Sequence, residues 1–88
     1  MNNPKAEITF PVMWEFRIIV VADKYAGACK DILAVFSGRN FDVSIQNGQK
    51  SSGGKYQALH ISVEMPDRET LNAISCEIVK VDGVKLLV

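Results

Sequence analysis

The sequence predicts a small α+β domain, in which a four-stranded antiparallel sheet carries two helices on one face in the ferredoxin-like βαββαβ arrangement. Three observations support this prediction. The chain has 88 residues, which suits one domain. Its apolar residues alternate with a period of two in some segments and follow helical spacing in others. The resulting order is strand, helix, strand, strand, helix, strand, and right-handed crossovers interleave these elements into strand order 4-1-3-2.

The first strand and the first helix are predicted from consecutive apolar patterns. Every even position from 14 to 20 is apolar, whereas Glu15 and Arg17 are polar, as is typical of a half-buried strand over residues 14–21. Asp23 then suits the N-cap of a helix. Apolar residues follow helical spacing after it until Ser37 and Gly38, where we expect the helix to end.

The second and third strands are predicted on either side of a polar, glycine-bearing loop. Phe41, Val43 and Ile45 alternate with polar residues, so we expect a strand over residues 41–46. Residues 47–55 then form the predicted loop, and residues 56–65 form the third strand. The alternation places four of its side chains toward the core, and these are Leu59, Ile61, Val63 and Met65.

The rest of the chain predicts a second helix and a short last strand. Pro66 and Asp67 suit the start of a helix, and Leu71, Ile74 and Ile78 form its apolar stripe. A turn at residues 82–83 leads into a strand over residues 84–88. We expect residues 1–9 to form a flexible tail and residues 10–88 to form a single domain.

The composition of the chain argues against several classes of function. Ten basic residues balance ten acidic ones, so no net charge attracts nucleic acid or a membrane surface. No apolar run is longer than five residues, as in Ile18 to Ala22, which is too short to span a membrane, and we expect a cytoplasmic protein. Cys29 suits the core face of the first helix, and Cys76 lies away from the stripe of the second, which argues against a disulfide between them. No pattern for a metal or a cofactor is present.

The predicted architecture leaves one sheet face open, and this face supplies the candidate binding residues. Arg17, His60 and Lys85 are expected on neighbouring strands, beside a possible apolar patch. The alternative interpretation is a solvated face with scattered apolar residues. If the face is an interface, we expect a homodimer, a protein partner or a small effector to bind there. The residues assigned to this face are Arg17, Ile19, Val21, His60, Ser62, Lys85 and Leu87.

Four chemical alternatives find little support in the sequence. The loop from Gly48 to Lys55 lacks the glycine-lysine spacing of a phosphate loop. A nucleophilic pair of Cys29 and His60 requires a cysteine outside the core. An acylphosphatase, which shares the predicted fold, needs glycines and an arginine after the first strand, and residues 21–27 supply one glycine and no arginine. RNA binding through the open face remains the alternative function, with Tyr56 and His60 as its aromatic residues.

One segment carries a family resemblance. Read as S-S-x-G-x-Y before a strand, the segment that contains Ser51, Ser52, Gly54 and Tyr56 resembles the signature of the YbeD-like family of uncharacterised small bacterial proteins. Phe10-Pro11, Arg17 and the ending V-K-L-L-V also resemble that family's pattern. The resemblance implies a ferredoxin-like fold close to the ACT regulatory domains and implies no established catalytic activity.

A second, shorter segment resembles a ligand-binding corner of ACT domains. Asp23 follows the first strand, and Gly27 lies near the start of the next helix. The resemblance implies an amino-acid site at Asp23 and Gly27, although the proline of the ACT pattern is missing here. A helix-capping Asp23 and a close-packed Gly27 are the structural alternative. We therefore expect a non-enzymatic regulatory or adaptor module, forming a homodimer and needing no cofactor.

Overall fold

A computed structural model describes residues 9–88 of the chain. It contains the predicted sheet, with strand order β2-β3-β1-β4, which is the expected order 4-1-3-2 read from the other edge. The strands are β1 (Val12–Val21), β2 (Gln46–Lys50), β3 (Tyr56–Met65) and β4 (Val84–Leu87). The predicted tail lies almost entirely outside the described residues.

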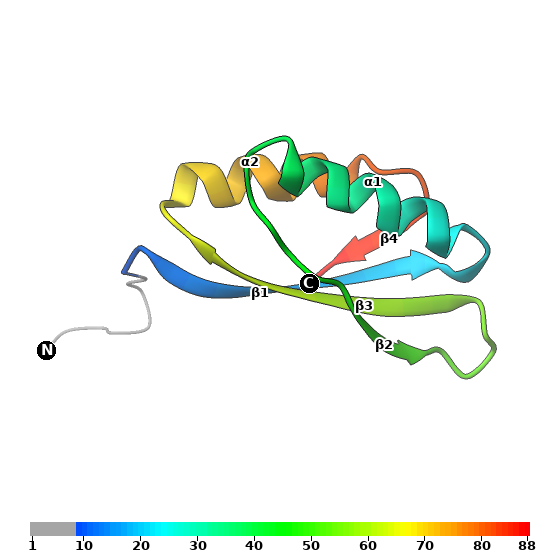
Figure 1. Cartoon of the computed structure of the whole chain (residues 1–88). Helices are drawn as coiled ribbons and strands as arrows, with labels where there is room; N and C mark the ends of the chain where they lie inside the picture. The colour runs from blue at the N-terminus through cyan, green and yellow to red at the C-terminus, as the bar shows by residue number, and fades with distance from the viewer. Residues whose placement is uncertain (1–8) are drawn as a thin grey trace, which may run out of the picture.

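Both helices lie on the same side of the sheet, as Figure 1 shows, and the other side carries no helix. They are α1 (Tyr25–Ser37) and α2 (Arg68–Val79), and a short 3₁₀ helix, η2 (Ala22–Lys24), joins β1 to α1. This arrangement confirms the predicted fold class. Among the described residues, no helix has the length and apolar character needed to cross a membrane.

The core lies between the helices and the covered face of the sheet. Phe16, Ile18 and Val20 of β1 are at most 1% exposed, as the even-residue pattern predicted. Their aromatic neighbour is Phe36 of α1, whose ring meets the Phe16 ring edge to face at 5.5 Å between centroids. The other buried residues are Ala28, Ile32, Leu59, Ile61, Met65, Leu71, Ile74 and Ile78.

The second strand lies later in the chain than predicted. The alternating segment 41–45 is extended but belongs to no strand, and the ladder with β3 begins at Gln46. Phe41, Val43 and Ile45 pack against the core as partly buried side chains. The chain needs this segment to pass from the end of α1 down to the sheet edge (Figure 1). The alternation over residues 41–45 therefore reflects partial burial of the apolar side chains and not a strand. Part of the predicted loop, residues 47–50, belongs to β2.

The two predicted helix caps have different outcomes. Asp67 caps α2, because its carboxylate accepts a hydrogen bond of 2.7 Å from the Thr70 N–H, and this bond lowers the pKa of Asp67. Asp23 does not cap α1: it lies within η2, and the N-cap of α1 is Lys24 without a side-chain bond. The extra 3₁₀ turn shifts the helix start past the aspartate.

Candidate functional site

The open face of the sheet carries alternate residues of its two central strands. β1 and β3 pair antiparallel without a register shift, so the residues between the buried positions of both strands come together on the uncovered side. Arg17 therefore lies directly opposite His60, as the sequence predicted. The other open-face pairs of this ladder include Glu15 with Ser62 and Ile19 with Ala58.

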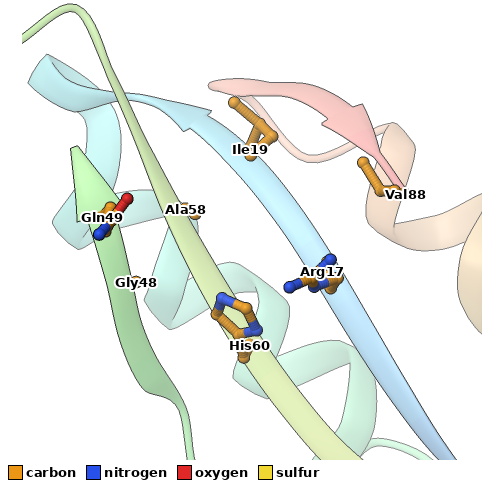
Figure 2. Close-up of a pocket in the computed structure, with 7 residues that line it drawn as sticks. All are labelled: Arg17, Ile19, Gly48, Gln49, Ala58, His60 and Val88. Carbon is orange, nitrogen blue, oxygen red and sulfur yellow. The ribbon is translucent and has the colours of Figure 1, made fainter. Parts of the chain in front are cut away.

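A hollow of about 340 Å³ lies on this open face. Figure 2 shows the Arg17 side chain and the His60 ring directed toward each other above the two central strands, with the helices behind the sheet. Ala58 has a small side chain, so it fills little of the hollow. The residues that line it are Arg17, Ile19, Gly48, Gln49, Ala58, His60 and Val88.

Glu15 holds the His60 ring in place. Its Oε2 lies 3.1 Å from Nδ1 of His60, and the His60 side chain is only 22% exposed. A carboxylate beside Nδ1 favours a proton on that nitrogen. The other ring nitrogen, Nε2, then carries the lone pair in the neutral ring.

Gly48 provides the room that the His60 ring occupies. A Cβ atom at this position would lie 2.9 Å from Nε2 of His60 and 2.9 Å from the Ala58 Cβ. Distances below 3.0 Å force one of the two sides to move, and Ala58 has no flexible end that would yield. The β2 backbone therefore passes close to the ring only because residue 48 is glycine.

Arg17 supplies the positive charge of the hollow. None of the ion pairs within residues 9–88 includes it, and its side chain is directed over the open face in Figure 2. Its backbone carbonyl accepts a 2.8 Å hydrogen bond from the Val88 N–H, which holds β4 beside β1. Because guanidinium groups bind carboxylates and phosphates in a two-pronged geometry, Arg17 suits an anionic group.

Several residues assigned to the open face do not line the hollow, and one of them lies on the covered side. The β1–β4 register places Leu86 opposite Ile19 and Leu87 opposite Ile18, so Leu87 packs against the core and its open-face assignment is wrong. The cause is a bulge: Val84 pairs with Val20, and Lys85 is the extra residue. Lys85 is exposed and Ser62 lies on the open face, but neither lines the hollow.

The sequence predicted an apolar patch of Ile19, Val21 and Leu87, and the bulge puts Leu86 in the place of Leu87 beside Ile19. Leu86 is 55% exposed and Val88 is 66% exposed, and Ile19, the partner of Leu86, is half-buried. We call Ile19, Leu86 and Val88 the apolar patch. The apolar patch adjoins the hollow, because two of its residues, Ile19 and Val88, also line the hollow.

A second hollow, of about 440 Å³, lies at the corner after β1. It brings Asp23 together with Val21 and with Gly54, Lys55 and Tyr56 of the β2–β3 turn. The Ala22 N–H donates a 2.8 Å hydrogen bond to the Lys55 carbonyl, which joins the two segments. Gly27 is not part of this hollow.

The structure also contradicts the close-packed interpretation of Gly27. A Cβ atom built on Gly27 would meet nothing within 4 Å, and the residue is exposed on α1. No close approach therefore explains this glycine. The corner hollow instead joins Asp23 to the turn that carries the family signature, a contact that the sequence did not predict.

The serine-glycine-tyrosine signature forms the β2–β3 turn. The Ser51 N–H donates to the Tyr56 carbonyl at 2.9 Å, and the Gly54 N–H donates to the Ser51 carbonyl at 2.9 Å. The Ser51 hydroxyl also accepts a 3.1 Å hydrogen bond from the Tyr56 N–H. Gly54 has a φ of 74°, which favours glycine. Ser51 and Gly54 thus have structural roles in the signature, and Ser52 is exposed.

Neither cysteine shows the features of a catalytic nucleophile. Cys29 and Cys76 are free thiols. Burial raises the pKa of Cys29, so less of the reactive thiolate forms. Cys29 lies on α1, across the sheet from His60. Within residues 9–88, no three His, Cys, Asp or Glu side chains gather as a metal ion requires.

Sequence reasoning missed four residues of the open-face hollow. Gly48 and Gln49 were assigned to a loop, and Ala58 of the third strand was not among the candidate binding residues. The position of Gly48 follows once β2 is placed. Gln46 pairs with His60, and Gly48, two residues later, lies on the same face of the sheet beside His60. Val88 was assigned only to the last strand.

Comparisons with known proteins agree with this fold. The model of a family described as "Protein of unknown function (DUF493)" matches residues 5–88, and this is the YbeD family that the signature resembles. No curated protein matches the chain significantly.

Solved structures with the same ACT-like, ferredoxin-like fold share little sequence with the chain. A solution structure of protein HP0495 from Helicobacter pylori has a TM-score of 0.79 at 17% identity, covering 93% of this chain and 86% of that one. A second structure of HP0495 gives 0.66 at 19% identity, with 90% and 87% covered. The C-terminal domain of the MgtC protein from Mycobacterium tuberculosis gives 0.65 at 13% identity, with 93% and 89% covered.

Proposed function

This chain belongs to the DUF493 family of proteins of unknown function, and we propose that it is a non-enzymatic regulatory or adaptor module that binds a small anionic effector on its open sheet face. One observation carries the proposal: Arg17, which has no ion-pair partner within residues 9–88, lines a hollow with His60 on the side that the helices leave uncovered. A site of this kind binds without needing a nucleophile or a metal.

The surroundings of Arg17 support an anionic ligand. The hollow combines a cation and a histidine with apolar contributions from Ile19, Ala58 and Val88. Small-ligand sites typically pair an apolar lining with a few polar groups that fix orientation. The regulatory part of the proposal rests on the ACT-like fold and is an argument from fold alone.

Substitution of Arg17 tests the proposed binding. We expect a panel of small carboxylates and phosphates to include a compound that raises the melting temperature, because a ligand of the folded state stabilises it by mass action. In Arg17→Gln its affinity should fall by about tenfold or more, as expected for a lost hydrogen bond to a charged group.

The matched control is Arg39→Gln. Arg39 is also a surface arginine, but it pairs with Glu77 of α2 at 2.6 Å, on the helix side of the molecule. Its substitution should leave the affinity unchanged. Equal losses in both variants would indicate nonspecific attraction of anions, and no binding by any anion would remove the proposed function.

The predicted homodimer is a second candidate, which the apolar patch favours. Leu86 and Val88 are large exposed apolar residues beside Ile19, and such patches commonly form interfaces. Light scattering should report a dimer, and Ile19→Glu should weaken it. A monomer at high micromolar concentration would contradict the prediction. A dimer unchanged by Ile19→Glu would place the contact at a sheet edge or on a helix.

RNA binding remains the alternative, with less support. Proteins of this architecture stack bases on aromatic residues of the central strands. At the centre of the open face the corresponding residues are Arg17, Ile19, Ala58 and His60, and Tyr56 lies at the end of β3 beside the turn. Salt-sensitive retention of the chain on single-stranded RNA would favour this alternative over the effector site.

A further inference from the structure

The polar groups of the open-face hollow differ in hydrogen-bonding character. Arg17 offers only donors. His60 offers an acceptor while it is neutral, because Glu15 beside Nδ1 favours the tautomer that keeps the proton there. The hollow therefore presents a cationic donor and a neutral acceptor to the same ligand.

Gly48 lies beside the acceptor atom and adds no side chain on that side of the ring. Nε2 is directed toward β2, where a Cβ atom on residue 48 would lie 2.9 Å away. The glycine leaves that space open, and both Gly48 and His60 line the hollow. The ring thus presents Nε2 on the β2 side, while Arg17 reaches the hollow from β1 (Figure 2).

The charges around the hollow suit a single negative charge. Glu15 lies against the His60 ring and, two residues from Arg17 on the same strand face, partly offsets its positive charge. β2 contributes Gly48 and Gln49, which carry no charge. A ligand with a second negative charge would be repelled by Glu15. The balance favours a monocarboxylate over a doubly charged phosphate.

We propose that this hollow binds a small aliphatic hydroxy carboxylate, whose carboxylate pairs with Arg17 and whose hydroxyl donates to Nε2 of His60. Its carbon chain lies over Ala58, between Ile19 and the His60 ring. Glu15 acts as a positioning residue, since it sets the tautomer without contacting the ligand. This assignment rests on the proposed function and names the ligand class for the same site.

The test compares three kinds of probe on the folded protein: butanoate, butanoate with a hydroxyl on its second, third or fourth carbon, and the methyl ethers of those hydroxy acids. Amide chemical shifts followed by NMR give each affinity. At about pH 8, where a histidine is mainly neutral, one hydroxy acid should bind about three- to tenfold tighter than its ether. The ether accepts hydrogen bonds but donates none.

Variants separate this inference from the proposed function. In His60→Phe the hydroxy acid and its ether should bind equally, while Arg17→Gln should weaken all three probes alike. Glu15→Gln should reduce the preference for the hydroxyl, because an amide favours neither tautomer. The backbone spectrum of each free variant reports whether it remains folded.

Each alternative result decides between the two claims. Binding of butanoate that depends on Arg17, without any advantage for a hydroxyl at about pH 8, would overturn the hydroxy-acid assignment and leave the anion site standing. Tighter binding of inorganic phosphate than of every hydroxy acid would do the same. Absence of Arg17-dependent binding by all probes would overturn both.

Discussion

The two faces of the sheet differ in burial and in the kinds of side chain that they carry. On the covered face, Ile18 of β1 is fully buried, whereas its neighbour Ile19 is half-buried on the open face beside a hollow that contains Arg17 and His60. Because successive residues of a strand point to opposite sides, the same ten residues of β1 serve both surfaces. Neighbouring residues of β1 thus contribute alternately to the stability of the core and to the proposed ligand site.

The separation is less complete at the edge strands. β4 has a bulge at Lys85, which moves Leu87 to the covered side and Leu86 to the open side. β2 carries Asn47 on the covered side, where its Oδ1 accepts a hydrogen bond from the Tyr25 hydroxyl of α1. One position later, Gly48 meets the open-face His60 ring. Substitutions at the edges should therefore affect both faces, and those at the centre only one.

The largest expected effect comes from adjacent substitutions at the centre of β1. Ile18→Ala should lower the free energy of unfolding by about 2 to 5 kcal/mol, because it leaves a cavity in a packed core. Ile19→Ala, the matched control, removes the same atoms from a partly exposed site and should cost about 1 kcal/mol or less. Urea denaturation measures both. Similar losses would show that the open face also contributes to the core.

An intermediate effect is expected at Gly48. Gly48→Ala places a Cβ atom against Ala58 and the His60 ring, and overpacking of this kind costs about 1 to 3 kcal/mol where neighbours cannot move. At an edge strand we expect the lower value, about 1 kcal/mol, because β2 is free to shift outward. Either movement, of β2 or of the His60 ring, changes the shape of the hollow, so carboxylate binding should weaken.

Gly53→Ala is the control for this variant. Gly53 lies in the turn after β2, and a Cβ atom there would meet nothing within 4 Å. We expect Gly53→Ala to retain both stability and carboxylate binding, as measured by urea denaturation and NMR titration. Retained binding in Gly48→Ala would show that the close approach of β2 to His60 is irrelevant to the site.

The sequence predicted the covered face better than the open one, for a physical reason. The spacing of apolar residues shows which side chains are buried. It therefore predicted correctly the core side of β3 and the apolar stripe of α2, formed by Leu71, Ile74 and Ile78. In α1 the pattern was less sharp: the apolar residues at helical spacing included Leu33, which is 39% exposed, as well as Ala28 and Ile32, which are buried.

The hollow was harder to predict, because the features that form it do not change the spacing of apolar residues. Arg17 and His60 were predicted as neighbours because a regular register follows from alternation. Leu87 was misplaced because a bulge shifts register without a distinct residue pattern, and Gly48 was missed because apolar alternation over residues 41–45 marks burial without strand pairing. The signature turn was recognised, but its contact with the Asp23 corner depends on the three-dimensional fold.

The smallest effect concerns the titratable groups on the covered side, at the link between α1 and β2. Burial, followed by the nearby Cys29, raises the pKa of Tyr25 from 10.0 to about 12. The folded state thus resists ionisation of Tyr25 more than the unfolded state does. The associated stability is complete below about pH 10 and is lost as the pH rises toward 12.

Tyr25→Phe should therefore lower stability slightly at neutral pH, by about 1 kcal/mol for the lost hydrogen bond, and should lose less stability than the parent protein as the pH rises from 10.0 toward 12. Asn47→Ala removes the same hydrogen bond but keeps the half-buried phenol, so it should keep most of the alkaline loss of the parent protein, because burial is the largest cause of the raised pKa. Urea denaturation across this pH range measures all three proteins. A steep alkaline loss that persists in Tyr25→Phe would assign it to other groups, and the covered side would then be no more sensitive to alkali than the open face.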